Sequence, residues 1–498
     1  MKNFVKSIVF IFIILSSYFS NAQVVKFRKV IGNSGYDYGM SAKQTSDKGY
    51  IIGGSTSSFG NGTSDVYLVK TDSLGIALWQ KTFGGINIDR GMCVRQTNDK
   101  GFIVTGYTNS YGAGGYDVYL IKTDSTGIEQ WEKTYGGTDW DFANCVEQTT
   151  DGGYIICGST YSYGKGNVDC YLIKTNSSGD TLWTKTFGGV NEDIANSVVQ
   201  TSDGGYILTG TTKSMGDTLG DFYTVKTNAF GDTLWTNIFG GSNLDYGNDV
   251  LESINGGYIV GGETQSFSYI VGSSDGIIEK ISVSGQTGAT YSTGFSSPLF
   301  DNIVSITEDN IGRIAMIGMT TSLGYGAPGD VYFNIVDSNF NWINSNTYGS
   351  PAYDIGYSIE NTNDRGFIVC GITEGYNSNG LDNIYLIKTD TLGTTTTTVD
   401  IEVTSVETVN SPSNESIILY PNPADKMIHL ILKSTFEDEF LITITDIIGR
   451  QYFSQKGKII RNNPININLS THDFKNGMYF MSIQNNNSIQ TKQFIINH

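Results

Sequence analysis

Histidine, cysteine and proline are scarce in this chain of 498 residues, and their scarcity excludes several kinds of chemistry. The only 3 histidines are His429, His472 and His498. Residues 23–393 therefore offer no imidazole for a Ser-His-Asp or Cys-His nucleophile or for a metal site. The 5 cysteines are odd in number and lack CxxC spacing, so neither a disulfide framework nor a zinc site is indicated. We expect small buried apolar side chains at Cys93, Cys145, Cys157, Cys170 and Cys370.

Long apolar segments and positive charge are scarce as well. After the first residues, no segment reaches the about 20 apolar residues that cross a bilayer, so we expect a protein that does not span a membrane. Lys and Arg total 31 against 49 Asp and Glu, a net charge of -18. Such a protein repels phosphate backbones, so nucleic acid is not an expected partner. Only 7 prolines but 61 glycines, 30 tyrosines and 25 phenylalanines favour turn-rich β structure.

The first residues have the composition of a secretory signal peptide. Lys2 and Lys6 precede an apolar run over residues 8–15, and small residues occupy positions 20–22. The run is too short to cross a bilayer. We therefore expect residues 1–22 to be removed during export, with cleavage after Ala22.

An internal repeat is the most informative feature of the chain. A glycine closes the most apolar strand of every unit, and successive glycines are 52, 52, 52, 52, 56 and 53 residues apart. An Asp series has the same intervals, which keeps the alignment through the irregular fifth and sixth units. The glycines are Gly54, Gly106, Gly158, Gly210, Gly262, Gly318 and Gly371. The aspartates are Asp37, Asp89, Asp141, Asp193, Asp245, Asp301 and Asp354. Residues 23–393 therefore contain seven repeats.

Each repeat holds four strand-like runs separated by turn residues, and four strands per about 50 residues is the spacing of propeller blades. The predicted fold class is all-β: a seven-bladed β-propeller of four-stranded blades, followed by a small C-terminal β-sandwich. A tryptophan recurs in the fourth run, and we expect it to pack between blades. These residues are Trp79, Trp131, Trp183 and Trp235. The pattern resembles kelch-like and other secreted bacterial β-propeller repeats, which implies an architecture rather than an activity.

The last repeat lacks its fourth strand, and the start of the chain resembles the missing piece. After Leu392 the Trp-Thr-Lys-Thr-Phe-Gly-Gly type of run gives way to Gly393 and five threonines, whereas residues 24–32 contain a similar run. We predict that residues 24–32 form the outer strand of the seventh blade and remove an open sheet edge. In an alternative phase, seven units are complete in order and this segment is the innermost strand of the first blade.

A second domain follows a tract that we interpret as a linker. Residues 394–415 are rich in Thr, Ser, Val and Glu without aromatic residues, and short alternating strands begin at residue 416. The landmarks of residues 416–498 are Tyr420, Pro421, Asn422 and Pro423 at the start, Gly449 in a Gly-Arg turn, Gly477 and Tyr479 in a Gly-x-Tyr strand, and Lys492 before the last strand. They resemble the type A sorting domain of proteins exported by type IX secretion systems of Bacteroidetes.

The resemblance implies a partner and a destination. The type IX translocon would recognise the C-terminal domain, and the protein would cross the periplasm to the outer cell surface or the medium. The alternative is an ordinary C-terminal binding sandwich.

Carboxylates recur at one rim of the predicted ring. The Asp37 to Asp354 series precedes the inner strands, and such a ring could bind Ca²⁺. We favour the other interpretation, in which each Asp caps a turn of its own blade, and we expect no other cofactor. A separate set of hairpin turns resembles the Asp-box of sialidases, where the Asp accepts bonds from backbone N–H groups. These residues are Asp47, Asp99, Asp151, Asp203 and Asp364.

Short Asp-Ser/Thr motifs resemble the O-glycosylation sites of exported Bacteroidetes proteins. Because the repeats copy such motifs, the modification is a hypothesis only. The candidate acceptors are Ser73, Ser125, Thr181, Thr218, Thr233 and Thr391.

These features predict an exported, surface-attached binding or adhesion protein rather than an enzyme. Blade tips rich in Tyr, Ser, Asn and Gly suit a glycan or protein ligand at the propeller face. The alternative is a carboxylate-based glycan-cleaving enzyme. It would need two acidic residues about 5 to 9 Å apart across the channel mouth.

Overall fold

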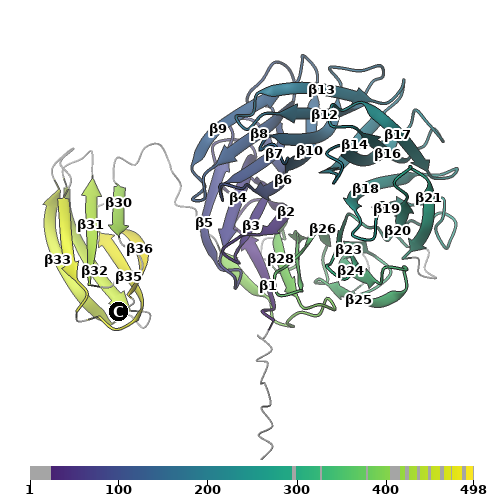
Figure 1. Cartoon of the computed structure of the whole chain (residues 1–498). Helices are drawn as coiled ribbons and strands as arrows, with labels where there is room; N and C mark the ends of the chain where they lie inside the picture. The colour runs from purple at the N-terminus through teal and green to yellow at the C-terminus, as the bar shows by residue number, and fades with distance from the viewer. Residues whose placement is uncertain are drawn as a thin grey trace, which may run out of the picture. The chain divides into compact units, whose positions relative to one another are not determined.

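The computed structural model describes residues 24–293, 299–325, 328–376, 380–403, 416–420, 426–433, 438–446, 450–459, 465–472, 474–484 and 489–496 (Figure 1). The expected signal peptide, residues 1–22, lies outside them. The chain divides into two compact units, Met1–Val406 and Glu407–His498. The described residues form strands and turns, and no helix among them could span a membrane. The all-β fold class is therefore confirmed.

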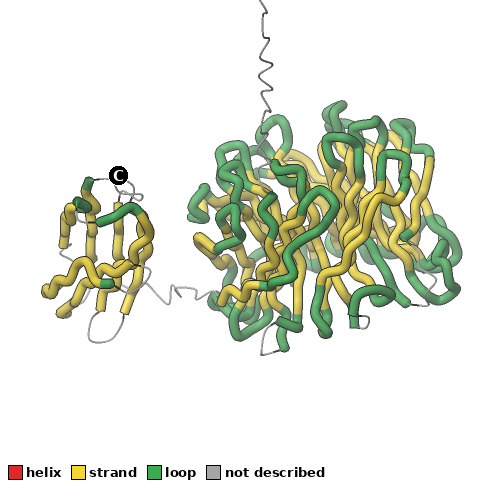
Figure 2. Tube along the Cα trace, turned by 90° about the horizontal axis from the view of Figure 1, so that it is seen from below, coloured by secondary structure: helices red, strands yellow, loops and turns green. Residues whose placement is uncertain are grey.

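Seven antiparallel blades form a closed ring in the first unit, as predicted (Figures 1 and 2). Blades 1 to 3 are β2 (Asp37–Gln44), β3 (Tyr50–Thr56), β4 (Asp65–Thr71), β5 (Ala77–Phe83); β6 (Asp89–Gln96), β7 (Phe102–Thr108), β8 (Asp117–Thr123), β9 (Glu129–Tyr135); and β10 (Asp141–Gln148), β11 (Tyr154–Thr160), β12 (Asp169–Thr175), β13 (Thr181–Phe187). Blades 4 to 6 are β14 (Asp193–Gln200), β15 (Tyr206–Thr212), β16 (Asp221–Thr227), β17 (Thr233–Phe239); β18 (Asp245–Glu252), β19 (Tyr258–Thr264), β20 (Asp275–Ile281), β21 (Thr287–Ser292); and β22 (Ser305–Glu308), β23 (Ile314–Thr320), β24 (Asp330–Val336), β25 (Trp342–Tyr348). Blade 7 contains β26 (Asp354–Asn361), β27 (Phe367–Thr373), β28 (Asn383–Thr389), β1 (Phe27–Gly32) and β29 (Asp400–Val403).

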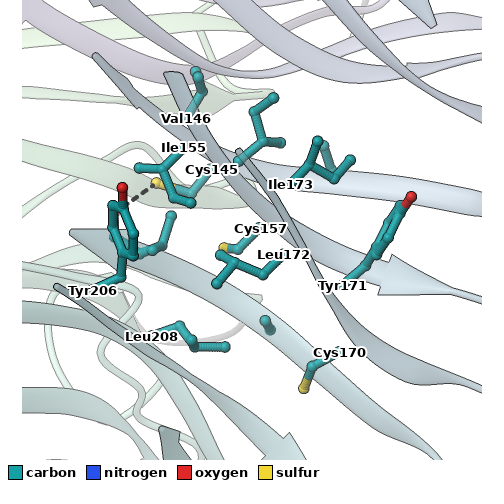
Figure 3. Close-up of a cluster of buried hydrophobic side chains, with 14 of the residues drawn as sticks. Cys145, Val146, Ile155, Cys157, Cys170, Tyr171, Leu172, Ile173, Tyr206 and Leu208 are labelled. Carbon is teal, nitrogen blue, oxygen red and sulfur yellow. Dashed lines mark hydrogen bonds between the residues drawn. The ribbon is translucent and has the colours of Figure 1, made fainter. Parts of the chain in front are cut away.

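The two middle strands of each blade carry the core. Every residue of β11 and β12 is buried, whereas most residues of the outer strand β13 are exposed or half-buried. The buried residues of blade 3 form one cluster with those of blades 2 and 4 (Figure 3). A strand whose sheet is covered on both faces has apolar residues at consecutive positions. This explains why the second and third strands are the most apolar segments of each repeat.

The cysteines belong to this core. All five are buried and free. Cys145 and Cys157 are direct cross-strand partners on β10 and β11. A hydrogen bond with Cys157, together with burial, raises the pKa of the Cys145 thiol to about 12. The Cys145 thiol is therefore a packing residue and not a nucleophile at neutral pH.

Tryptophans of the outer strands pack on the next blade, as expected. Trp131 lies in β9, the outer strand of blade 2, and the centroid of its ring is 5.9 Å from that of Tyr154 in blade 3. A Cβ on Gly179 would come within 2.8 Å of the same indole, and Gly179 has a φ of +80°. Glycine is required at that hairpin for both reasons. Three further rings repeat the contact: Trp79 with Phe102, Trp183 with Tyr206 and Trp235 with Tyr258.

The start of the chain closes the ring. Strand β1 pairs antiparallel with β28, with Val30 opposite Tyr385, and so forms the fourth strand of blade 7. This is the predicted arrangement, and the alternative phase, with β1 innermost in blade 1, does not occur. Arg28 donates hydrogen bonds to the hydroxyls of Tyr385 at 2.5 Å and Tyr376 at 2.6 Å. Side chains as well as backbone therefore hold the two ends of the ring together.

Part of the segment expected as a linker is a strand. Strand β29 pairs parallel with β1, with Asp400 opposite Lys29, and adds a fifth strand to blade 7. The Lys29 ammonium lies 3.1 Å from the Asp400 carboxylate. The alternating residues Asp-Ile-Glu-Val suit an edge strand, because charged side chains on an edge discourage pairing with other chains.

The second unit contains two sheets around one core. One sheet has the order β30 (Ser416–Tyr420), β31 (Met427–Lys433), β34 (Ile465–Ser470). The other has the order β33 (Gln451–Ile459), β32 (Asp438–Asp446), β35 (Gly477–Gln484), β36 (Ile489–Ile496). Buried side chains of both sheets, including Ile442, Leu469 and Phe494, share one cluster. The arrangement is that of the small β-sandwich predicted.

Candidate functional sites

The strand ends define two faces of the ring (Figure 2). On the connection face, each blade passes to the next and second strands pass to third strands. On the hairpin face, tight turns join first to second and third to fourth strands. Candidate sites occur on both faces.

The innermost strands of all seven blades line an axial cavity of about 450 Å³. Because the lining positions are equivalent in the repeats, their side chains form rings around the axis. One ring consists of Ser41, Cys93, Cys145, Ser197, Asp249, Ser305 and Ser358. The next consists of Lys43, Arg95, Glu147, Val199, Leu251, Thr307 and Glu360.

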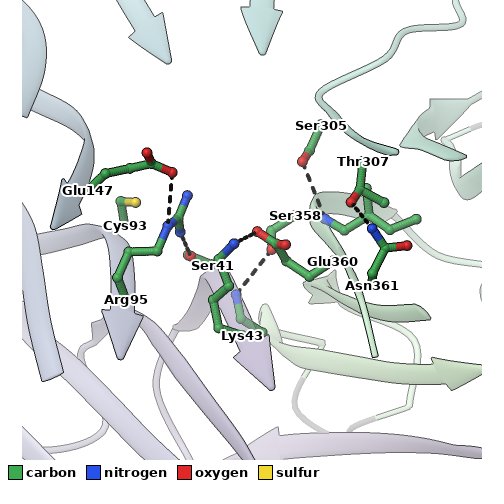
Figure 4. Close-up of polar contacts among 12 residues, drawn as sticks. Ser41, Lys43, Cys93, Arg95, Glu147, Ser305, Thr307, Ser358, Glu360 and Asn361 are labelled. Carbon is green, nitrogen blue, oxygen red and sulfur yellow. Dashed lines mark hydrogen bonds and ion pairs between the residues drawn. The ribbon is translucent and has the colours of Figure 1, made fainter. Parts of the chain in front are cut away.

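Four charged side chains of the cavity form two pairs between blades (Figure 4). Lys43 of blade 1 forms an ion pair with Glu360 of blade 7, and Arg95 of blade 2 lies 4.0 Å from Glu147 of blade 3. Burial raises the pKa of Glu147, although Arg95 acts to lower it. Each of the two glutamates thus has a cation from a neighbouring blade as its partner. Glu360 nevertheless acts to raise the pKa of Glu147, so the two carboxylates also interact across the cavity.

Asp249 is the carboxylate on the ring that otherwise carries Ser and Cys. It accepts hydrogen bonds from Ser197 Oγ at 2.7 Å, Ser305 Oγ at 3.0 Å and the backbone N–H of Ile306 at 3.0 Å. Burial raises its pKa, and these three donors act to lower it. Its contacts join blades 4, 5 and 6.

The aspartates from Asp37 to Asp354 are buried at the connection face. Asp141 accepts hydrogen bonds from Thr160 Oγ1, from Ser162 Oγ at 2.6 Å and from the N–H of Gly137 at 2.8 Å. Both carboxylate oxygens are therefore used within the blade junction, and the other blades repeat most of this pattern. Among the described residues, no group of three or more His, Cys, Asp or Glu could hold a metal ion.

The Asp-box turns pair with buried lysines. Asp151 accepts hydrogen bonds from Thr149 Oγ1 at 2.5 Å and from the N–H of Gly153 at 2.9 Å, and Lys174 lies 2.9 Å away. Partial burial opposes the change, but Thr149 and Lys174 lower the pKa of Asp151 to about 2. The same pair occurs at Lys70–Asp47, Lys122–Asp99, Lys226–Asp203 and Lys388–Asp364. These contacts give the turns a structural role.

The candidate O-glycosylation residues lie in loops and at strand starts. Ser73, Ser125, Thr181, Thr218 and Thr233 are exposed, and Thr391 is half-buried. In the first motif, Asp72 accepts hydrogen bonds from the N–H groups of Leu74 and Ile76 at 2.8 and 2.9 Å. The Asp thus shapes the turn, and the neighbouring hydroxyl is accessible.

The sorting-motif residues are partly described. Gly477 begins β35, and Tyr479 is buried, stacked 5.7 Å from Phe494, and donates to the carbonyl of Lys475 at 3.0 Å. Tyr420 ends β30 and Lys492 lies in β36. Pro421, Asn422, Pro423 and Gly449 lie outside the described residues.

A group of aromatic side chains was not predicted as a site. On the connection face, five aromatic residues gather at the junction of blades 2 and 3: Tyr107, Tyr116, Trp140, Phe142 and Tyr161, named here the aromatic cluster. Neighbouring ring centroids are 5.0 to 6.4 Å apart. Trp140 is 51% and Tyr161 is 42% exposed. A position-by-position comparison of the repeats marks these residues as departures from the common pattern, but it does not bring them together in space.

The fold and these sites define an all-β propeller protein with a separate C-terminal sandwich. Residues 418–497 match the family model described as the secretion system C-terminal sorting domain. The resemblance seen at the Tyr-Pro-Asn-Pro and Gly-x-Tyr landmarks is therefore confirmed. The chain carries the signal of type IX secretion and is exported to the cell surface or the extracellular medium.

Other similarities are weak. A stretch of 163 residues is 26% identical to the regulatory protein FlaEY of Caulobacter vibrioides, and it spans 28% of this chain and 17% of that protein. Among solved structures, PorZ, a surface component of the type IX secretion system of Porphyromonas gingivalis, is 10% identical, with a TM-score of 0.30 over 88% of this chain and 64% of PorZ. A puromycin hydrolase is 12% identical, with a TM-score of 0.45 over 80% of this chain and 58% of the hydrolase.

Proposed function

We propose that the propeller is the binding module of an exported adhesion protein displayed at the outer cell surface, with a glycan or a protein as its ligand. In this proposal residues 1–22 are a cleaved signal peptide and residues 23–393 bind. Residues 394–415, which include β29, lead to the sorting domain of residues 416–498. The type IX translocon recognises that domain. The exposed Ser and Thr residues of the loops are candidate glycosylation sites.

One observation carries the proposal: the residues that hold each blade together repeat from blade to blade, whereas the residues that line the axial cavity differ. The capping Asp of the first strand is the same residue in all seven blades. The axial ring that begins at Lys43 instead contains cations, carboxylates, aliphatic residues and a threonine. A scaffold with constant blades and a varied surface is what a binding module requires.

The cavity supports binding over catalysis. Hydrolysis by a carboxylate pair needs one free nucleophile or base and one acid. Glu147 and Glu360 are instead engaged with Arg95 and Lys43 (Figure 4). The capping role of the Asp37 series, rather than a Ca²⁺ ring, agrees with the hydroxyl and N–H donors around Asp141.

A display experiment in the native host tests the proposal. Cells carrying the full chain are compared with cells in which residues 24–403 are replaced by an inert folded reporter, keeping the N-terminal segment and the sorting domain. Surface amounts are matched by antibody staining. We expect the full chain to increase attachment to at least one of two coatings, polysaccharide or protein, relative to the reporter. Equal attachment of both strains to both coatings would contradict a binding role. Sugar release that E147Q and E360Q abolish would favour the enzyme.

A further inference from the structure

The aromatic cluster distinguishes its blade junction from the two junctions that flank it. The five positions that hold Tyr107, Tyr116, Trp140, Phe142 and Tyr161 have equivalents at every blade junction. Between blades 1 and 2 they are Ser55, Ser64, Ile88, Arg90 and Asn109. Between blades 3 and 4 they are Ser159, Val168, Glu192, Ile194 and Lys213. Both flanking junctions thus lack aromatic residues at all five positions.

Packing of the blades does not account for the cluster. The flanking junctions have the same strand pairing and the same capping Asp without any of these rings. At the next junction, Lys213 and Glu192 form an ion pair at 2.9 Å in place of Tyr161 and Trp140. Grouped aromatic side chains that are half exposed mark a contact surface rather than a core.

The rings present both apolar faces and polar edges. Trp140 stands edge-on to Tyr116 and Tyr161, with both centroids 5.9 Å away. Tyr107 lies edge-on to Phe142 at 5.0 Å. Four of the five side chains carry a hydroxyl or an indole N–H, and none carries a formal charge at neutral pH. A ligand with C–H faces and hydroxyl edges complements such a surface, and a pyranose ring has this chemistry.

We propose that the aromatic cluster binds a neutral glycan. This inference rests on the proposed function and names the ligand class of the propeller. A net charge of -18 disfavours polyanionic ligands. A protein partner needs about 800 Å² on each side, whereas the cluster covers one junction and is bordered by the Glu192–Lys213 ion pair.

A binding assay with the full chain tests the inference. The neutral polysaccharides are β-glucan, mannan, xylan and chitin, and alginate is the anionic comparison. The test variant W140E/Y161K copies the pair that blade 4 uses, so the junction keeps a residue combination that this fold accommodates. W140I and Y161N introduce the residues that blade 2 has at these positions. They replace the double variant in the assay if it fails to fold. The matched control, E192Q/K213Q, alters the adjacent junction on the same face. Thermal unfolding checks that each variant is folded.

We expect the chain to bind at least one neutral polysaccharide, W140E/Y161K to weaken this at least tenfold, and E192Q/K213Q to change it less than twofold. Neutral-glycan binding that W140E/Y161K leaves intact would overturn the site. Binding confined to alginate or to protein coatings would overturn the ligand class while leaving the binding role standing. A chain that increases attachment to no coating would instead contradict the proposed function itself.

Discussion

The aromatic ring of Phe27 lies 5.8 Å from that of Tyr50 at an interplanar angle of 72°. Trp79 and Phe102 show the same relation between blades 1 and 2, at 5.8 Å and 61°. A Cβ on Gly75 would come within 2.7 Å of the Phe27 ring. Phe27 therefore takes the place of the missing tryptophan where blade 7 meets blade 1.

This equivalence predicts that ring closure depends on Phe27. The side chain is 6% exposed, so F27A should lower the free energy of unfolding by about 3 kcal/mol. F27W should stay within about 1 kcal/mol of the natural chain, because tryptophan occupies this position in four blades. Chemical denaturation of the full chain measures both. Equal destabilisation by the two substitutions would show that the position is not equivalent to that of Trp79.

The Lys226–Asp203 pair should respond asymmetrically to mutation. Lys226 is 2% exposed in its side chain and Asp203 is 56% exposed, with 2.9 Å between them. D203N leaves the buried Lys226 ammonium with weaker acceptors and should lower the free energy of unfolding by about 2 kcal/mol. K226I leaves an unpaired carboxylate that water can reach, so it should lower the free energy of unfolding by less.

Blade 6 lacks both partners of this pair, because Ile311 and Ile335 occupy its two positions. The double variant D203N/K226I should therefore be more stable than the sum of the two single effects implies. Additive effects in a double-mutant cycle by denaturation would show that the two residues do not act together.

Glu279 should make stability depend on pH. It is buried in β20, where β4, β8, β12 and β16 carry Val or Ile. Burial raises the pKa of Glu279 to about 7, although the neighbouring Thr287 side chain acts to lower it. The folded chain thus holds this proton more tightly than the unfolded chain, whose glutamate has a pKa of about 4.3. The contribution to stability is fully present below about pH 4 and is lost as pH rises to 7.

The substitution E279V, which copies Val225 of blade 4, should remove this pH dependence. We expect it to raise the free energy of unfolding at pH 8 by about 2 kcal/mol and to flatten the profile between pH 4 and 7. Denaturant unfolding at a series of pH values measures the effect. A natural chain whose stability is constant over that range would contradict the raised pKa.

The blades could be predicted from the sequence because each repeat carries the same local chemistry. Asp141, Gly158 and Trp131 each act within one blade or across one junction, so their spacing reports the fold directly. The partner of β1 could also be predicted, because a missing outer strand leaves an edge that only a similar segment can cover.

The aromatic cluster and β29 could not be predicted in the same way. Tyr107 lies in β7, whereas Tyr116 and Trp140 lie in two different connections, and only the folded ring brings the three together. Strand β29 is four residues long and pairs parallel with a strand about 370 residues earlier in the chain, so no local pattern predicts it. Residues 400–403 instead share the composition of residues 394–415, which the sequence indicates as a linker.

Surface exposure of the propeller in the native host tests the account most directly. Chains ending at residue 498 or at residue 403 are expressed at equal levels, and the fraction of propeller that external protease degrades in intact cells is measured. The sorting domain, residues 418–497, is what the translocon recognises in this account. We therefore expect the full chain to be accessible outside the cell and the truncated chain to remain protected in the periplasm. Equal degradation of both chains in intact cells would contradict the assignment of export to the C-terminal domain.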